Sequence, residues 1–302
     1  MAVNQAVVFT KPVHHININL TPGRLDELAR KYFEDKGFRI VCSKKVTGSE
    51  LAAREVIKQH YLMYSKASCA ESISDLDISV EGKVKFESAF GNRWDDEVAT
   101  GRIITTLQLL SAKGIDAHQL FNLWNVQFLD RKTAKIQDGL LMAYLEDLGC
   151  YCINAFYPAM EANFKNLATQ IDYYVLEFDP EQISWKQFRK NILGVTDSSK
   201  AEPGSFRGQL YADYKIDFPG RDNFVHGSAG PFEAFVERAI HESDFEMEAN
   251  PIGTYLTGRG VTLKTFAAWK ASQSVSTIGE LFDATEEKNT HEIIPILDGI
   301  KF

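Results

Sequence analysis

Apolar and polar positions in the first part of the chain predict a strand, a helix, a strand and a helix in turn. The short apolar run AVVFT at residues 6–10 is typical of a buried strand. The segment TPGRLDELARKYFEDKGF spaces its apolar side chains along one helical face, with an N-cap at Thr21 and a stop at Gly37. FRIVCSKKV predicts a second strand, and SELAAREVIKQHYLMYSK predicts a second helix that begins at Ser49.

The middle of the chain loses this alternation. Residues 66–92 are rich in Ser, Asp and Glu and have weak periodicity, which predicts a loop or linker. Helical spacing returns in NRWDDEVATGRIITTLQLLSAKGIDAHQLFNLWNV, with a turn expected at Gly114, and RKTAKIQDGLLMAYLEDLGC is a further helix candidate. We therefore predict a mainly helical insertion over residues 66–150.

The alternation resumes after the insertion. QIDYYVLEF predicts a strand, ISWKQFRKNILGV a helix that ends near Gly194, and TDSSKAEPGSFRG a loop rich in turn residues. YADYKIDF is compatible with a strand and PFEAFVERAIHE predicts a helix, whereas the remaining C-terminal segment contains helix-like and turn-like pieces whose order the pattern does not give. With the insertion set aside, this order is that of a ferredoxin-like α+β fold, an antiparallel sheet with helices.

Composition and charge narrow the class of protein. Of 302 residues, 44% are hydrophobic and 25% are charged, as in an ordinary soluble globular protein with a sizeable core. No run approaches the roughly 18 consecutive apolar residues of a membrane span, and no export signal is visible. The 4 cysteines form no disulfide framework, so we expect reduced thiols in an intracellular, cytoplasmic protein. The net charge of -8 argues against nucleic acid as the main partner.

Two segments in the second half carry a specific resemblance. ILGVTDSSKAEPGSFRGQL followed by NFVHGSAGPFEAFVERAI resembles the nucleoside diphosphate kinase signature, in which LGxTxxxxAxPGxxRG precedes NxxHGS and a helix. VVFTKP, YFEDKGFRIVCSK, QHY and AFYPAMEANF resemble further parts of that family, so the similarity covers about residues 6–64 and 153–241. It implies three regions: a discontinuous kinase-like domain (1–65 and 151–245), the insertion (66–150) and a C-terminal extension (246–302).

The resemblance implies a catalytic histidine. His226 would take the γ-phosphoryl group from a nucleoside triphosphate and pass it to a nucleoside diphosphate by a ping-pong route. An imidazole can be unprotonated near neutral pH and can therefore attack phosphorus directly. Glu237 matches the carboxylate that hydrogen-bonds this histidine, and Ser228 matches a hydroxyl beside the phosphoryl group.

The resemblance also implies a nucleotide site. The following residues match the family's phosphate and ribose contacts: Lys11, Tyr61, Lys190, Thr196, Arg207 and Asn223. Phe156 matches the aromatic residue on which the base stacks. Mg²⁺ would bridge the phosphates. The partners implied are nucleoside di- and triphosphates, without nucleic acid or membrane, together with a homo-oligomer unless the insertion prevents assembly, and a protein partner for the insertion.

Four positions depart from the family pattern. Val13 and Ala229 stand where the family has aspartates, and Asn154 stands where it has a basic residue. Lys190 stands where the family has a phosphate-binding arginine, a role that the neighbouring Arg189 could take after a small rotation. Tyr61 and Phe156 are by default core aromatics. An alternative function is therefore open: a weak or inactive kinase-like scaffold or nucleotide-binding interaction protein, whose contacts are made by the insertion.

Overall fold

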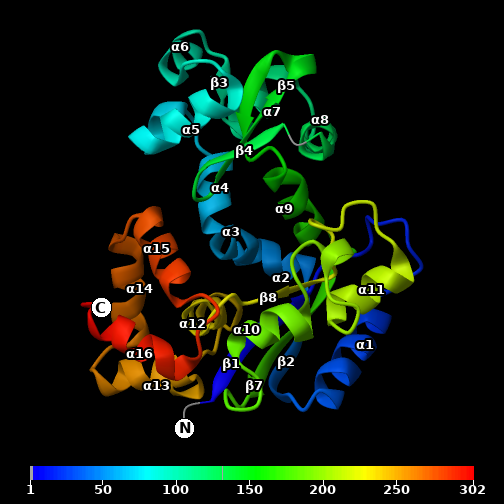
Figure 1. Cartoon of the computed structure of the whole chain (residues 1–302), viewed down its shortest axis with the longest axis vertical. Helices are drawn as coiled ribbons and strands as arrows, with labels where there is room; N and C mark the ends of the chain where they lie inside the picture. Colours follow the sequence, from blue (N-terminus) through cyan, green and yellow to red (C-terminus); the bar gives the residue numbers. More distant parts are fainter. Residues whose placement is uncertain (1–2, 131) are drawn as a thin grey trace. The chain divides into compact units, whose positions relative to one another are not determined.

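The computed structural model describes residues 3–130 and 132–302, which form two compact units (Figure 1). The first unit contains the chain up to Val56 together with Phe164–Phe302, and the second contains Ile57–Asn163. No helix in these described ranges is long and apolar enough to cross a membrane.

The limits of these units differ from those of the predicted regions. The second unit begins before residue 66 and ends after residue 150. The segment after residue 245, predicted as an extension, belongs to the first unit, where its helices contact α12 (Pro231–His241).

A four-stranded sheet forms the centre of the first unit, with the strand order β2-β7-β1-β8 and antiparallel pairing throughout. Its strands are β1 (Asn4–Thr10), β2 (Arg39–Thr47), β7 (Gln170–Phe178) and β8 (Val225–Gly227). This order, with helices joining the strands, is that of the predicted ferredoxin-like fold. The predicted α+β fold class is therefore confirmed.

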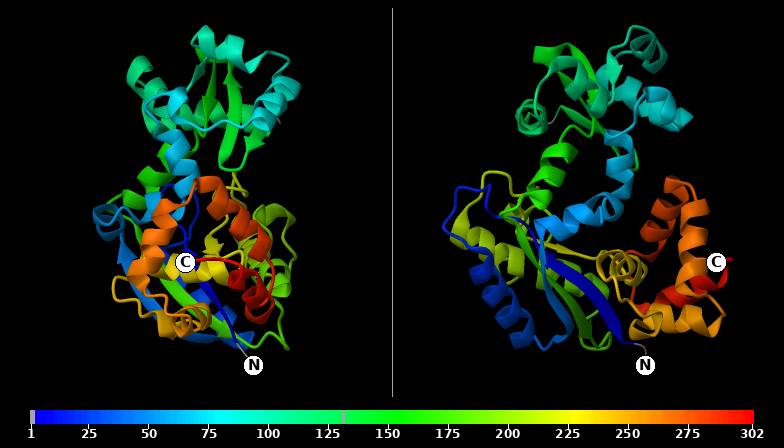
Figure 2. Two further views of the ribbon diagram at one scale, coloured as in Figure 1. Left: turned by 90° about the vertical axis from the view of Figure 1, so that its left-hand side faces the viewer. Right: turned by 180° about the vertical axis from the view of Figure 1, so that it is seen from behind.

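Side chains of β1 alternate between the two faces of the sheet, and helices cover both faces. Ala6 and Val8 join the core that contains Phe33 of α1 (Pro22–Asp35). Phe9 points to the other face, where its ring centroid lies 5.2 Å from that of His241 in α12. Figure 2 shows α1 in blue on one side of the sheet, and α12 with the orange and red C-terminal helices on the other. Both faces of β1 are consequently buried.

Several predicted helices have the expected ends. At the start of α1, the Thr21 side chain accepts a hydrogen bond from the Arg24 N–H at 3.2 Å, and after its end Gly37 has a φ of +83°. The segment ISWKQFRKNILGV forms α10 (Trp185–Gln187) and then a π-helical turn, η3 (Phe188–Leu193). Gly194, with a φ of +95°, follows η3 as predicted.

The second predicted helix is instead three short helices. They are α2 (Gly48–Ala53), α3 (Val56–His60) and α4 (Leu62–Ser68), and the second unit begins at Ile57, within α3. The first of them begins at a Thr47–Glu50 capping box rather than at Ser49. Glu55 then adopts a φ of +49°, which an α-helix of L-residues cannot continue through.

The second unit contains its own four-stranded sheet, in the order β3-β6-β5-β4. Its strands are β3 (Ile103–Ile104), β4 (Thr133–Gln137), β5 (Leu140–Leu145) and β6 (Cys150–Ile153). Its further helices are α5 (Val80–Phe90), α6 (Trp94–Ala99), α7 (Thr106–Lys113), α8 (Ala117–Leu129) and α9 (Tyr157–Lys165), of which α9 continues past the limit of the unit. Gly114, with a φ of +62°, separates α7 from α8 as predicted.

Two predictions for the insertion are wrong. The helix candidate at residues 131–150 contains the antiparallel pair β4 and β5, joined at Asp138-Gly139, because an Asp-Gly pair between apolar runs favours a tight hairpin turn. The predicted linker at 66–92 contains α5, which is capped by Ser79 and buries Phe86. The polar average composition of residues 66–92 hid this short helix.

The proposed strand YADYKIDF is also wrong, because it begins inside α11 (Phe206–Tyr214). Phe206, Leu210 and Tyr214 recur at helical spacing and all pack in the core. Beyond α12, the C-terminal segment forms four helices: α13 (Pro251–Gly258), α14 (Leu263–Ser272), α15 (Val275–Thr285) and α16 (Thr290–Asp298).

Candidate active site

His226 lies on the edge strand β8, directly opposite Phe9 of β1. The two rings stack, with centroids 4.6 Å apart and planes inclined by 19°. Phe9 is fully buried, so it offers the histidine a fixed flat surface. The His226 side chain remains 15% exposed, and the pairing of β8 with β1 therefore positions an oriented and still accessible imidazole.

Glu237 of α12 connects His226 to Ser228. His226 Nε2 lies 2.7 Å from Glu237 Oε1, and the Ser228 hydroxyl donates to Glu237 Oε2 at 2.6 Å. The backbone N–H of Val7 donates to the same hydroxyl oxygen at 3.0 Å. A carboxylate only accepts hydrogen bonds, so it favours the tautomer with hydrogen on Nε2 and the lone pair on Nδ1.

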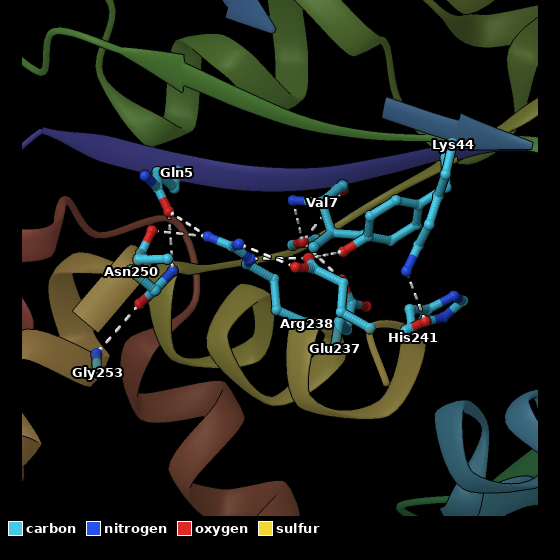
Figure 3. Close-up of polar contacts among 12 residues, drawn as sticks. Gln5, Val7, Lys44, Glu237, Arg238, His241, Asn250 and Gly253 are labelled. Carbon is cyan, nitrogen blue, oxygen red and sulfur yellow. Dashed lines mark hydrogen bonds and ion pairs between the residues drawn. The ribbon is translucent and has the colours of Figure 1, made fainter. Parts of the chain in front are cut away.

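A buried polar network fixes α12, and with it Glu237, against the sheet (Figure 3). Arg238 donates to both carboxylate oxygens of Glu242, at 2.8 and 2.9 Å, and to the Gln5 side chain on β1 at 3.0 Å. Asn250 also donates to Gln5, at 3.3 Å, and Lys44 donates to the carbonyl of His241 at 3.0 Å. This network was not predicted from the sequence, although the spacing of four residues between Arg238 and Glu242 along a helix is a usable signal for an ion pair.

Burial and nearby cations keep His226 neutral. Burial lowers the pKa of the imidazole well below 6.5, and the charges of Lys11, Arg207 and Arg189 lower it further. Lys11 is affected in the same way, since burial and then Arg207 lower its pKa to about 7. Cations that destabilise one another in this way favour the binding of an anion.

Two of the predicted nucleotide-binding residues fix the loops around His226. Arg207 donates from its two terminal nitrogens to the carbonyls of Gly194 and Val225, both at 2.7 Å. Asn223 donates to the carbonyl of Thr196 at 2.7 Å, while its own Oδ1 is buried without a hydrogen-bond partner among the described residues. That oxygen is available to a hydroxyl donor of a ligand.

Residues that the sequence analysis did not select surround Lys11. Its ammonium group donates to the carbonyl of Arg221 at 3.1 Å. Asp222 accepts from Arg221 Nε at 2.6 Å and lies 3.2 Å from His15 Nε2. Burial tends to raise the pKa of Asp222, but these two partners hold it below its ordinary value. The sequence GRDN directly before FVHG was a signal for this cluster.

Arg189, rather than Lys190, contributes positive charge to His226. Lys190 is exposed, whereas the Arg189 side chain is 25% exposed and forms an ion pair with Glu286. Both residues lie in the π-helical turn η3, where the backbone N–H of Gly194 bonds five residues back to Arg189. This wider winding turns successive side chains by a smaller angle than an α-helix does.

Tyr61 and Phe156 belong to the second unit. The Tyr61 ring lies 4.5 Å from that of His60, between centroids, and Tyr61 is half-buried. Phe156 is also half-buried and packs on Tyr64 and Trp124, with centroid distances of 5.5 and 5.7 Å. Its partners within that unit are those of a core aromatic, and nucleotide binding by these two residues stays a prediction.

Three of the residues that depart from the family pattern make contacts with their own surroundings. Val13 is buried in the core of the first unit. Asn154 has a φ of +50°, which asparagine tolerates better than most residues, and it donates to the carbonyls of Tyr64 and Gly139 within the second unit. The N–H of Ala229 donates to Glu233, whose pKa is raised by burial and by the charge of Glu237.

Comparison with known proteins gave matches among solved structures alone. Neither the protein-family models nor the curated proteins gave a match. The nucleoside diphosphate kinase of Encephalitozoon cuniculi is 15% identical, over 80% of this chain and 90% of that one, with a TM-score of 0.37. The NDP kinase of Pyrobaculum aerophilum is 16% identical, over 80% and 97%, with a TM-score of 0.35. The enzyme of Borrelia burgdorferi, with bound vanadate and ADP, is 16% identical, over 81% and 89%, with a TM-score of 0.34.

Proposed function

We propose that the protein is a nucleoside diphosphate kinase that transfers the γ-phosphoryl group of a nucleoside triphosphate through a phosphohistidine at His226. The observation that carries the proposal is the hydrogen-bonded series Ser228, Glu237 and His226, with its 2.6 and 2.7 Å contacts. It sets the tautomer and the plane of an imidazole whose pKa is lowered, mainly by burial. These are the requirements for a neutral nitrogen nucleophile.

The reaction has two displacements at phosphorus. The lone pair on His226 Nδ1 attacks the γ-phosphorus, the bond from that phosphorus to the bridging oxygen breaks, and the nucleoside diphosphate leaves with the electron pair. A terminal oxygen of a second nucleoside diphosphate then attacks the phosphohistidine, and the N–P bond breaks to return the lone pair to Nδ1. Glu237, accepting from Nε2–H, would stabilise the positive charge that develops on the ring.

Cationic side chains would bind the phosphates in both steps. Lys11 would gain charge stabilisation from a phosphate, because burial and Arg207 now disfavour its protonated form. Asp222 is engaged by Arg221 and His15, so the phosphates themselves fit best as the main ligands of Mg²⁺. The ion would neutralise part of the charge on the transferred group.

The test is transfer of label from radiolabelled ATP. We expect wild-type protein to form an acid-labile, base-stable adduct and to pass it to a second nucleoside diphosphate, and His226→Ala to form none. His291→Ala, at an exposed histidine of α16, is the matched control and should behave as wild type. A folded wild-type protein that takes up no label, or a labelled His226→Ala, would contradict the proposal.

One observation favours a second function, a nucleotide-binding interaction protein without turnover. Both terminal nitrogens of Arg207 are bound to backbone carbonyls, which leaves this guanidinium less able to follow a moving phosphoryl group. Calorimetry with ADP separates the two functions, since this alternative predicts binding without label on His226.

A homo-oligomer and a protein partner for the insertion remain further proposals, to be tested by light scattering of the full chain.

A further inference from the structure

The last residue of α15 and the connection to α16, together residues 285–289, form a segment that we name the tail loop, and it lies against the segment that follows His226. The backbone N–H of Glu287 donates to the carbonyl of Ala229 at 2.9 Å. A Cβ atom on Gly230 would lie 2.5 Å from the carbonyl oxygen of Thr285, so the backbones touch without room for a side chain. The tail loop is therefore closely fitted to the turn between β8 and α12.

Three further hydrogen bonds hold the tail loop and the residue after it in place. The side-chain oxygen of Asn289 accepts from Asn4 on β1 and from the backbone N–H of Trp185, both at 2.9 Å. Thr290, the next residue, donates from its backbone to the side chain of Asn4 at 2.9 Å. The loop is thus tied to β1 and to the start of α10, which leads into the turn η3 that carries Arg189.

The tail loop contributes carboxylates to Arg189. Arg189 Nη1 forms a close ion pair with Glu286 and lies 3.7 Å from a carboxylate oxygen of Glu287. Within the described part of the chain, Nε and Nη2 of Arg189 make no hydrogen bond. One side of the guanidinium is thus held by the tail loop, while the other keeps donors in the planar arrangement that suits a phosphate.

The resemblance places a phosphate-binding arginine of the family at Lys190, with Arg189 beside it, and we propose that Glu286 is the positioning residue that orients the Arg189 guanidinium toward that phosphate. The ligand is the terminal phosphate of a nucleoside di- or triphosphate, so the inference rests on the proposed function. Arginine loses rotamer freedom when it binds, and a fixed carboxylate at one nitrogen removes part of that loss beforehand. The C-terminal segment would thereby complete the active site, although it lies outside the signature segments.

A double-mutant cycle tests the pair. We expect Arg189→Ala to slow phosphorylation of His226 by about 10- to 100-fold, since it removes hydrogen bonds to a charged group. Glu286→Ala should slow it by roughly 3- to 10-fold, and the double variant should be no slower than Arg189→Ala, because Glu286 acts only through Arg189. Glu280→Ala, at an exposed glutamate of α15, is the matched control and should leave the rate unchanged.

A second readout separates this inference from the proposed function. The dissociation constant for ADP should rise in Arg189→Ala and Glu286→Ala, again without additivity, even if wild-type protein forms no phosphohistidine. Independent, additive losses in the two variants would overturn the inference, as would tighter ADP binding by Glu286→Ala, which would make Glu286 a competitor of the phosphate. Wild-type protein that neither transfers phosphate nor binds ADP would overturn both.

Stability must be followed in parallel, because the tail loop packs closely. Glu286→Gln keeps the size of the side chain and removes its charge, so it should reproduce most of the Glu286→Ala effect with an unchanged unfolding midpoint. A normal rate in folded Glu286→Gln would contradict the positioning role.

Discussion

Lys11 and His226 show how burial sets the charge of single residues in this site. Both groups lie among cations, and burial lowers both pKa values, so the site contains a neutral imidazole and a lysine near its titration midpoint at neutral pH. The first is suited to attack phosphorus, and the second gains a proton most readily when an anion arrives. Neither property follows from residue type, because it depends on what surrounds each group.

The affinity for ADP should therefore depend on pH through Lys11. Its pKa of about 7 means that the ammonium form is lost as the pH rises above that value, so the dissociation constant should increase by up to about tenfold per pH unit. His226 is already neutral in this range and adds no slope. Calorimetric titrations between about pH 6 and pH 9 measure the effect.

Lys11→Arg is the control for that experiment, because arginine keeps its charge throughout the range. The pH dependence should flatten in this variant. An equal slope in wild type and Lys11→Arg would show that another group is responsible.

At the scale of elements, α12 carries Glu237 and is held by charges that are buried with it. Arg238 and Glu242 have side-chain exposures of 6% and 7%, and Tyr173 donates to the same glutamate at 2.6 Å. Arg54 donates to the last carbonyls of the helix, those of Ile240 and His241. A cation at a helix C-terminus is also stabilising because that end of the helix dipole carries partial negative charge.

Arg238→Ala should consequently destabilise the fold by about 3–5 kcal/mol, since it leaves the buried Glu242 without its cationic partner. Urea unfolding measures this loss. Arg24→Ala removes an exposed pair, with side chains 57% and 68% accessible, and should cost at most about 1 kcal/mol. Similar losses in the two variants would mean that the buried network does not hold α12.

At the scale of the whole molecule, the C-terminal helices complete the fold of the first unit. Phe232 of α12 packs on Phe266 and Phe282, with ring centroids 6.2 and 5.9 Å apart. The ring centroids of Phe235 and Phe266 lie 4.9 Å apart. The outer face of α12 is therefore buried by residues that the resemblance assigned to an extension.

A chain that stops at residue 245 should be strongly destabilised. Each exposed phenylalanine loses about 1.5–3 kcal/mol of burial, and two of them should lower the unfolding midpoint by about 10 °C or more. Circular dichroism and size-exclusion chromatography would detect the change and any aggregation. Leu263→Ala, at a partly exposed position of α14, should have little effect. A truncated monomer with an unchanged midpoint would mean that the segment is independent.

The sequence by itself determined the local features. The cap at Thr21, the stops at Gly37 and Gly194, and three strands of the central sheet, β1, β2 and β7, follow from spacing and from residues with strong backbone preferences. The fourth strand, β8, was not predicted. The Asp138-Gly139 hairpin was predictable in the same way and was missed, because the apolar run around it also fits a helix. The choice of His226, Glu237 and Ser228 came from a motif, and their contacts lie within one strand and the following helix.

Tertiary structure alone decided which distant groups act on that motif. The charge of Arg189 acts on His226, and its partner Glu286 follows it by 97 positions in the chain. The lowered pKa values of Lys11 and His226 arise from burial and from cations on other elements. Periodicity reports only which face of an element is buried, whereas electrostatic effects depend on distances through space that the completed fold sets.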